Sequence, residues 1–131
     1  MKRMEDGRYV DFRWQEGVLI GTFLNKDRSI TREIAKAGET ERFKMQEGKE
    51  SPLMIKAEKW VHFTAGALHY FANSKRKNGI SAAAIIISDK RVAYYAGVFK
   101  RILPELSFKV EFFSDEDAAL KWLKQFVTEI S

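Results

Sequence analysis

The residues of this chain with the widest chemical repertoire are its two histidines, His62 and His69. An imidazole can bind a metal or transfer a proton near neutral pH. We expect both at the entrance of one helix, where they could approach each other. A metal site needs more ligands than these two, and a general base needs a nucleophile within reach. Neither pattern accompanies them, so we predict no catalytic residue, no metal site and no cofactor.

Thr64 is the hydroxyl with two candidate roles. As the N-cap of the helix that follows, it would accept a hydrogen bond from a backbone N–H group. As a modification site, it would carry a phosphate at a helix N-terminus, where the helix dipole favours negative charge. The two roles are compatible, and we expect the cap while keeping Thr64 as a candidate regulatory residue.

Aromatic residues supply the other candidates for function. Tyr94 and Tyr95 are adjacent in an expected helix, so both cannot be buried and one should face solvent or a partner. Exposed aromatic side chains mark interfaces, and open sheets bind ligands beyond the carboxyl ends of their strands. The candidate ligand or partner surface therefore comprises Trp60, His62, His69, Tyr70, Tyr94 and Tyr95.

Two other groups that could suggest a site have simpler explanations. Asp115, Glu116 and Asp117 follow Ser114, and acidic residues after a capping residue are typical of a helix start rather than of a metal site. The glycines Gly66 and Gly97 are isolated, so they match no phosphate-binding loop.

Hydrophobic periodicity predicts the elements that position these residues. We expect strands at Tyr9–Trp14, Val18–Leu24, Pro52–Ala57, Ile80–Ile87 and Phe108–Phe113. We expect helices from Ser29 or Thr31 to Glu47, over Ala65–Lys77, over Lys90–Leu103 and over Asp115–Ile130. The first helix has a thin apolar stripe of Ile30, Ile34, Ala37 and Met45 and should lie on the surface of the domain.

The order of these elements predicts an α/β fold. The first two strands form an antiparallel hairpin that turns at Gly17, and the remaining strands and helices alternate. Alternation indicates crossover connections and a mainly parallel sheet of four or five strands with helices on both faces. The continuous apolar run Ile80–Ile87 is typical of a strand that is buried on both faces.

Length and composition indicate that the expected strands and helices form a single domain, residues 1–131. The hydrophobic fraction of 45% is enough for one core, and the absence of cysteine excludes disulfides and thiol chemistry. We find no secretory signal and no apolar run long enough for a membrane span. A soluble, cytoplasmic protein is expected.

A net charge of +5 favours acidic partners in general, including nucleic acid. The densest basic cluster, Lys75–Lys77, falls where a helix should end, and cations are favourable there. We therefore expect a solvated helix end and no nucleic-acid interface.

Several phrases of the sequence resemble a known family. They are Ile30-Thr31 at the first helix, Gly48 before the strand Pro52–Ala57, and the run from Phe112 to Leu123, which includes Ser-Asp-Glu-Asp. The chain resembles the SpoIIAA-like group of small bacterial proteins, in the STAS superfamily of anti-sigma-factor antagonists. The resemblance implies a four- or five-stranded sheet, four helices and a non-enzymatic role in protein binding or regulation.

The resemblance also identifies one departure. Relatives in the superfamily bind an anti-sigma kinase and are switched by phosphorylation in an Asp-Ser-Ser-Gly segment at the start of the second helix. The matching segment here is Phe63–Gly66, in which Ala65 occupies the phosphoserine position. Only Thr64 and Gly66 are compatible with the motif, and this argues against the kinase switch.

Three non-enzymatic functions are consistent with these observations. The first is a protein-binding or regulatory module of the SpoIIAA-like kind, expected as a homodimer with an unknown protein partner. The second is a small-molecule or lipid carrier of the Sec14-like type, suggested by the aromatic content and a distant likeness in fold. The third, a nucleic-acid binder, rests on charge alone, and an enzyme is the reading we favour least.

Overall fold

The computed structural model describes residues 10–24, 29–57, 62–72, 79–87 and 108–127, together with Tyr94, Gly97 and Arg101. Within these ranges it gives the backbone but not the side-chain environment of Ala57, His62, Phe63, Leu68, His69, Phe71 and Ala72. Trp60, Tyr95 and the basic cluster Lys75–Lys77 lie outside the described residues.

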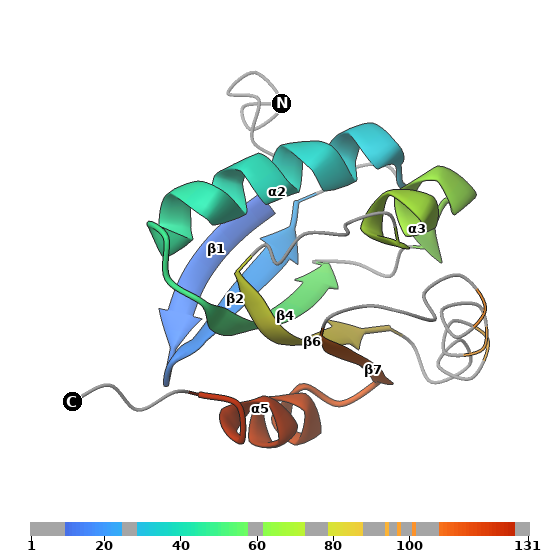
Figure 1. Ribbon diagram of the computed structural model, residues 1–131. Coiled ribbons are helices and arrows are strands. Elements are labelled where there is room, and N and C mark those ends of the chain that lie inside the picture. The colour runs from blue at the N-terminus through green and yellow to red at the C-terminus, as the bar shows by residue number, and fades with distance from the viewer. Residues whose placement is uncertain are drawn as a thin grey trace.

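The centre of the domain is a five-stranded sheet with the order β1-β2-β4-β6-β7 (Figure 1). Its strands are β1 (Val10–Gln15), β2 (Val18–Phe23), β4 (Ser51–Ala57), β6 (Ile80–Ile86) and β7 (Lys109–Phe113). β1 and β2 are antiparallel, whereas each of the other three neighbouring pairs is parallel. The mainly parallel sheet with an antiparallel hairpin at its edge is therefore confirmed.

A two-residue turn closes the hairpin between Gln15 and Val18, which face each other across it. Glu16 and Gly17 both have positive φ, 53° and 86°, as in the tight turns that match the twist of a hairpin. A Cβ atom at Gly17 would lie 2.7 Å from Cγ1 of Val127. Glycine is needed here both for its backbone conformation and for the space it leaves.

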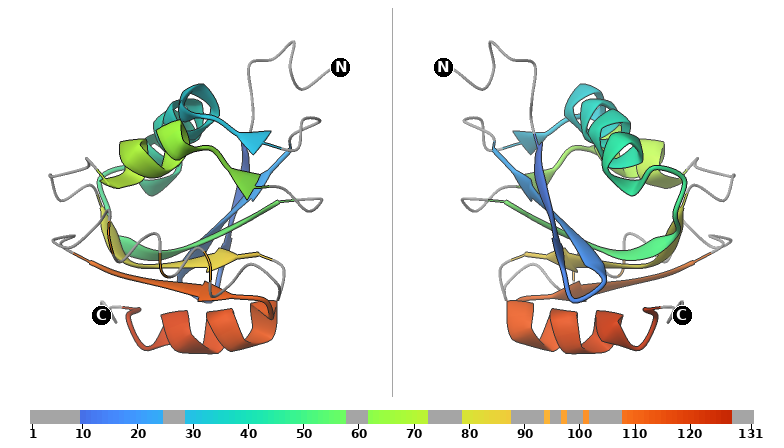
Figure 2. Two further views of the ribbon diagram at one scale, coloured as in Figure 1. Left: turned by 90° about the vertical axis from the view of Figure 1, so that its right-hand side faces the viewer. Right: turned by 90° about the vertical axis from the view of Figure 1, so that its left-hand side faces the viewer.

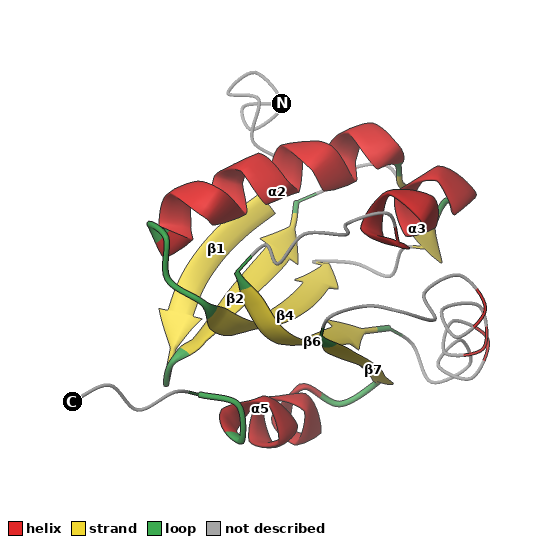
Figure 3. Cartoon of the chain, in the orientation of Figure 1, coloured by secondary structure: helices red, strands yellow, loops and turns green. Residues whose placement is uncertain are grey.

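Helices cover both faces of the sheet, as Figures 1 and 2 show. α2 (Arg32–Gln46) and α3 (Ala65–Ala72) lie side by side on one face, and α5 (Glu116–Lys124) packs on the other. Figure 3 shows the same layers coloured by secondary structure. No helix in the described ranges is long and apolar enough to cross a membrane.

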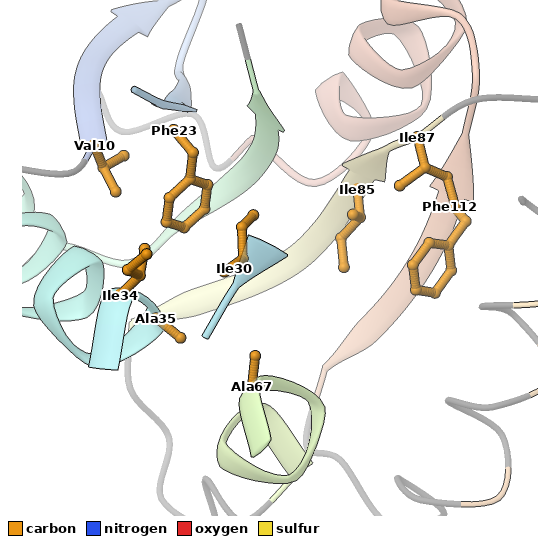
Figure 4. Close-up of a cluster of buried hydrophobic side chains, with 9 residues drawn as sticks. All are labelled: Val10, Phe23, Ile30, Ile34, Ala35, Ala67, Ile85, Ile87 and Phe112. Carbon is orange, nitrogen blue, oxygen red and sulfur yellow. The ribbon is translucent and has the colours of Figure 1, made fainter. Parts of the chain in front are cut away.

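Hydrophobic core residues lie on both sides of the sheet. On the α5 side, Ala119 and Leu123 pack with Val18, Ile20, Met54, Ala82 and Ala84. On the α2 and α3 side the cluster in Figure 4 comprises Val10, Phe23, Ile30, Ile34, Ala35, Ala67, Ile85, Ile87 and Phe112. β6 contributes to both sides, so the expected burial of this strand on both faces is confirmed.

The structure also corrects several expectations. The described residues contain three helices, not four. The fourth, expected over Lys90–Leu103, falls mostly outside them, and within it only Tyr94, Gly97 and Arg101 are described, each with a helical backbone. Asp115, not Ser114, caps α5, because its side chain accepts a hydrogen bond from the N–H of Ala118.

The inner stripe of α2 differs from the thin apolar stripe that was expected. Ile30 precedes the helix, in the short strand β3, and Ala37 and Met45 are only half-buried. The buried residues of α2 are Ile34, Ala35, Gly38, Arg42 and Gln46. Two of these five are polar, so a helix that was expected to lie on the surface instead buries a guanidinium and an amide against the sheet.

Candidate functional site

The starts of α2 and α3 are held together by a second, two-stranded sheet that the periodicity did not predict. β3 (Ser29–Ile30) and β5 (His62–Phe63) pair in parallel, with Ser29 opposite His62 and Ile30 opposite Phe63. Each of these strands leads directly into a helix. The pairing therefore places two helix N-termini side by side (Figures 1 and 2).

A threonine caps each of the two helices. The Thr31 hydroxyl accepts a hydrogen bond from the N–H of Ile34 at 3.3 Å, and the Thr64 hydroxyl accepts one from the N–H of Ala67 at 3.2 Å. Thr64 also donates to the carbonyl oxygen of Ile30, from its hydroxyl at 3.3 Å and from its N–H at 3.1 Å. The expected role of Thr64 as an N-cap is confirmed, and the same side chain joins α3 to the strand before α2.

Small residues follow Thr64 and leave an open surface at the start of α3. Ala65 and Gly66 are exposed, and so is Arg32 in the first turn of α2. A Cβ atom at Gly66 would lie 3.5 Å from Cβ of Arg32, so the two helices are in close contact here. The Arg32 guanidinium lies 5.9 Å from the centre of the Tyr70 ring, within the range of a cation–π interaction.

A polar network continues from Tyr70 along the inner side of α2. The Tyr70 hydroxyl donates a hydrogen bond to one carboxylate oxygen of Glu39. The other oxygen of Glu39 accepts a hydrogen bond from the Arg42 guanidinium at 3.3 Å. Arg42 is 3% exposed, and its guanidinium also lies 4.5 Å from the centre of the Phe43 ring. The network thus ties α3 to a charge that is buried beneath α2.

From Arg42 the network reaches the amino ends of two central strands. Arg42 donates to the side-chain oxygen of Gln46 at 2.7 Å. The Gln46 amide nitrogen donates to the Ser51 hydroxyl at 3.1 Å and to the carbonyl oxygen of Gly79 at 2.8 Å. Ser51 begins β4, and Gly79 precedes β6. A continuous chain of hydrogen bonds therefore links α3, α2 and the sheet.

Burial shifts the pKa of two members of this network. Desolvation lowers the pKa of Arg42, and the nearby Glu39 carboxylate opposes that shift. The pKa of Tyr70 is raised to about 12, first by desolvation and then by its hydrogen bond to Glu39. A phenol with this pKa stays protonated and acts as a donor, so it serves the contact with Glu39 rather than proton transfer.

This raised pKa predicts a loss of stability at high pH. The neutral phenol is favoured in the folded state, so its contribution is complete below pH 10, the ordinary tyrosine pKa, and is lost as pH rises towards about 12. We expect tyrosinate absorbance in the difference titration between wild type and Tyr70→Phe to rise near pH 12. A midpoint near pH 10 would contradict the burial of Tyr70 together with its hydrogen bond to Glu39.

Most of the chain, including the residues described so far in this site, matches one protein family. A family model described as Domain of unknown function (DUF7793) matches residues 12–127. The chain belongs to this family. The match runs from β1 past the end of α5, so it includes every member of the polar network. No curated protein matches the sequence.

Two of the sequence-predicted candidates of this DUF7793 chain, Thr64 and Tyr70, belong to the same region of the structure. Thr64 and Tyr70 both lie in or beside α3, and Tyr70 is half-buried against α2. His62 lies in β5 and His69 in α3, but their side chains are outside the described part of the structure. Tyr94 is 64% exposed, in agreement with the expectation that one residue of the Tyr94-Tyr95 pair faces outward.

Sequence reasoning missed the DUF7793 residues that form the polar network, Glu39, Arg42 and Gln46. A signal for them exists, because their spacing places them on adjacent turns of one helix face, next to the buried Ala35 and Gly38. Polar residues that continue an apolar stripe indicate buried hydrogen bonds.

Among the described residues, no group of three or more His, Asp or Glu side chains could hold a metal ion.

Proposed function

We propose that this DUF7793 domain is a non-enzymatic, cytoplasmic bacterial module of the SpoIIAA-like, STAS type. In this proposal it binds a protein partner in a regulatory role and acts as a homodimer. The mixed sheet with its N-terminal hairpin and with helices on both faces supports the likeness. The partner would bind at the joined starts of α2 and α3, which we call the α2–α3 entrance and define by Arg32, Thr64, Ala65 and Gly66.

One observation carries the proposal: the α2–α3 entrance is exposed and at the same time firmly held. Ala65, Gly66 and Arg32 are exposed. Beneath them, Thr64 is bonded to Ile30, and α3 is tied to α2 through Tyr70. A surface that is fixed before binding loses little conformational entropy when a partner binds. Small side chains also let a partner approach the backbone of α3.

The state of the nearby polar groups supports binding over catalysis. The Thr64 hydroxyl donates one hydrogen bond and accepts another within the fold, so it serves the structure of the helix start. Tyr70, with a pKa raised to about 12, is a donor at neutral pH. The positive ends of two helix dipoles meet at this surface, where Arg32 and Glu33 of α2 contribute opposite charges. An acidic segment of a partner protein fits it best.

Two matched substitutions test this surface. Ala65→Glu adds a long anionic side chain to the first turn of α3, and Ala118→Glu adds the same side chain to the first turn of α5, on the opposite face of the sheet. Both alanines are exposed, and an acid near a helix start favours the helix, so neither change should unfold the domain. We expect a partner captured by wild type to be retained by Ala118→Glu and lost by Ala65→Glu.

The measurement is affinity capture from a bacterial lysate, followed by binding of the identified partner to the purified variants. A partner that binds all three proteins equally would show that the α2–α3 entrance is not the binding surface. Capture of no protein by wild type would contradict the proposed function itself.

A further inference from the structure

The polar network beneath α2 connects two separate places in the domain. It begins at Tyr70, one helical turn after Gly66 of the α2–α3 entrance. It continues through Glu39 and ends at Gln46, which is about two turns further along α2. Gln46 lies beside the starts of β4 and β6, whereas the α2–α3 entrance follows the ends of β2 and β4. The network therefore leads from α3 to the opposite edge of the sheet.

Three planar groups in series form the middle of this connection. The Glu39 carboxylate accepts from Tyr70 through Oε1 and from Arg42 through Oε2. The Arg42 guanidinium donates to Glu39 through Nη2 at 3.3 Å and to Gln46 through Nη1 at 2.7 Å. The Gln46 amide accepts through Oε1 and donates through Nε2 to the strand starts. Each rigid group is thus held through different atoms at its two ends.

The chemistry of the members fixes the direction of these bonds. A guanidinium only donates, whereas a carboxylate and a peptide carbonyl only accept. Gln46 therefore turns its side-chain oxygen to Arg42 and its NH₂ group to the carbonyl oxygen of Gly79. A reversed amide would place two donors together at one end and two acceptors together at the other. The Gln46 amide consequently has one favourable orientation while Arg42 is in place.

Burial prevents the network from exchanging these bonds freely for water. Arg42, Gln46 and Ser51 are 3%, 2% and 5% exposed. A buried polar group that loses its partner is costly, whereas an exposed one binds water instead. When the Glu39 carboxylate moves, the Arg42 guanidinium is therefore expected to follow it. Because the guanidinium is planar and rigid, the nitrogen that faces Gln46 moves as well.

The end of the network at the strand starts has little free space. Gly79 has a φ of 87°, and a Cβ atom there would lie 3.1 Å from Oε1 of Gln46. The Gly79 carbonyl oxygen also accepts a hydrogen bond from the N–H of Ser51 at 3.0 Å. Gln46 thus contacts both residues that join the start of β4 to the start of β6. A shift of Gln46 is expected to disturb this junction.

We propose that the network is a conformational relay between the α2–α3 entrance and the starts of β4 and β6. Movement of α3 relative to α2 displaces the Glu39 carboxylate through Tyr70. The Arg42 guanidinium turns with it and draws Gln46 away from Gly79. Movement at the strand starts acts in the opposite direction, because an equilibrium coupling is reciprocal. The relay goes beyond the proposed function, since it is a property of this chain alone.

Native-state hydrogen exchange at Ser51 tests the relay. The Ser51 amide donates to Gly79 at one end of the network, and Tyr70→Phe removes only a hydroxyl at the other end. In this variant the Ser51 amide should exchange about tenfold faster than in wild type, beyond any change shared by amides that exchange on global unfolding. Thr40→Ala removes an exposed hydroxyl of α2 outside the network and should leave Ser51 exchange unchanged.

A double-mutant cycle gives a second readout. Gln46→Met keeps the approximate length of the side chain but removes its hydrogen bonds to the strand starts. If Tyr70 and Gln46 act through one network, the double variant should raise the unfolding equilibrium constant about fivefold less than the product of the two single effects. Lys44 is exposed on the same helix, so Tyr70→Phe combined with Lys44→Ala should show the simple product.

Either of two results would overturn the relay. The first is a Ser51 amide that Tyr70→Phe accelerates no more than the globally exchanging amides. The second is a pair of effects for Tyr70→Phe and Gln46→Met that multiply without coupling. Circular dichroism checks that each variant is folded, and if Gln46→Met is not, the exchange result for Tyr70→Phe decides alone. Neither measurement involves a partner, so failure of the relay can be told from failure of the proposed function.

Discussion

Replacing Glu39 by Ala should lower the free energy of unfolding by about 2–3 kcal/mol. Arg42 is 3% exposed, and a Glu39 carboxylate oxygen lies 3.3 Å from its guanidinium. Without this carboxylate, the buried guanidinium loses a compensating negative charge, and Tyr70 loses the acceptor of its hydrogen bond. The expected loss lies below that of a fully buried pair because the Glu39 side chain is 23% exposed.

A double variant separates charge from packing. Glu39→Ala/Arg42→Leu removes both members of the pair, and apolar replacement of both is often close to neutral. We expect it to recover at least part of the stability that Glu39→Ala loses, in urea unfolding followed by circular dichroism. Full recovery is not expected, because Gln46 loses its donor Arg42.

Glu41→Ala is the matched control on the same helix. Glu41 pairs with Lys44 at 3.9 Å, and the Lys44 side chain is 72% exposed. A pair of this kind contributes little, so the change should stay within about 0.5 kcal/mol of wild type. Equal effects of Glu39→Ala and Glu41→Ala would show that the buried network does not stabilise the fold.

The strands of the sheet could be predicted because each shows a clear pattern of apolar and polar residues within its own sequence. β1 alternates apolar and polar residues, and β6 is apolar except for Ser81 because both of its faces are covered. These patterns reflect burial, which acts residue by residue along a strand. The turn at Gly17 was also predictable, since positive φ favours glycine.

The small β3–β5 sheet could not be found in this way. Each of its strands has two residues, too few to show any period. Their pairing depends on segments that are far apart in the sequence, and the periodicity predicted no strand between β4 and α3, where β5 lies. Yet this pairing brings the starts of α2 and α3 together and so creates the α2–α3 entrance.

The candidate site was predictable only in part, for a related reason. Thr64 could be identified because a capping residue acts within its own helix. Glu39 and Arg42 resemble the solvated charges of a surface helix until α3 and the sheet are in place. Their burial is a tertiary property, and the hydrophobic pattern of α2 alone does not contain it. For Tyr70 the sequence indicated a candidate surface residue, whereas the structure shows it half-buried and bonded to Glu39.

Leu123→Ala should cost about 3 kcal/mol of unfolding free energy, because it leaves a cavity beneath α5. Leu123 is completely buried and packs with Met54 of β4 and with Ala82 and Ala84 of β6. Those two alanines let the helix approach the sheet closely, but they are too short to fill the space that a missing leucine side chain leaves. The sheet behind them is held on its other face by α2, so it cannot collapse into the cavity.

Two further substitutions on α5 make this test specific. Leu123→Met keeps most of the volume and should cost less than about 1.5 kcal/mol. Lys121 is exposed on the same helix, so Lys121→Ala should change stability by no more than about 0.5 kcal/mol. The order Leu123→Ala, Leu123→Met, Lys121→Ala in thermal and urea unfolding follows from burial alone. If Leu123→Ala were as mild as Lys121→Ala, α5 would not be packed on the sheet as described, and the second layer of the fold would have to be revised.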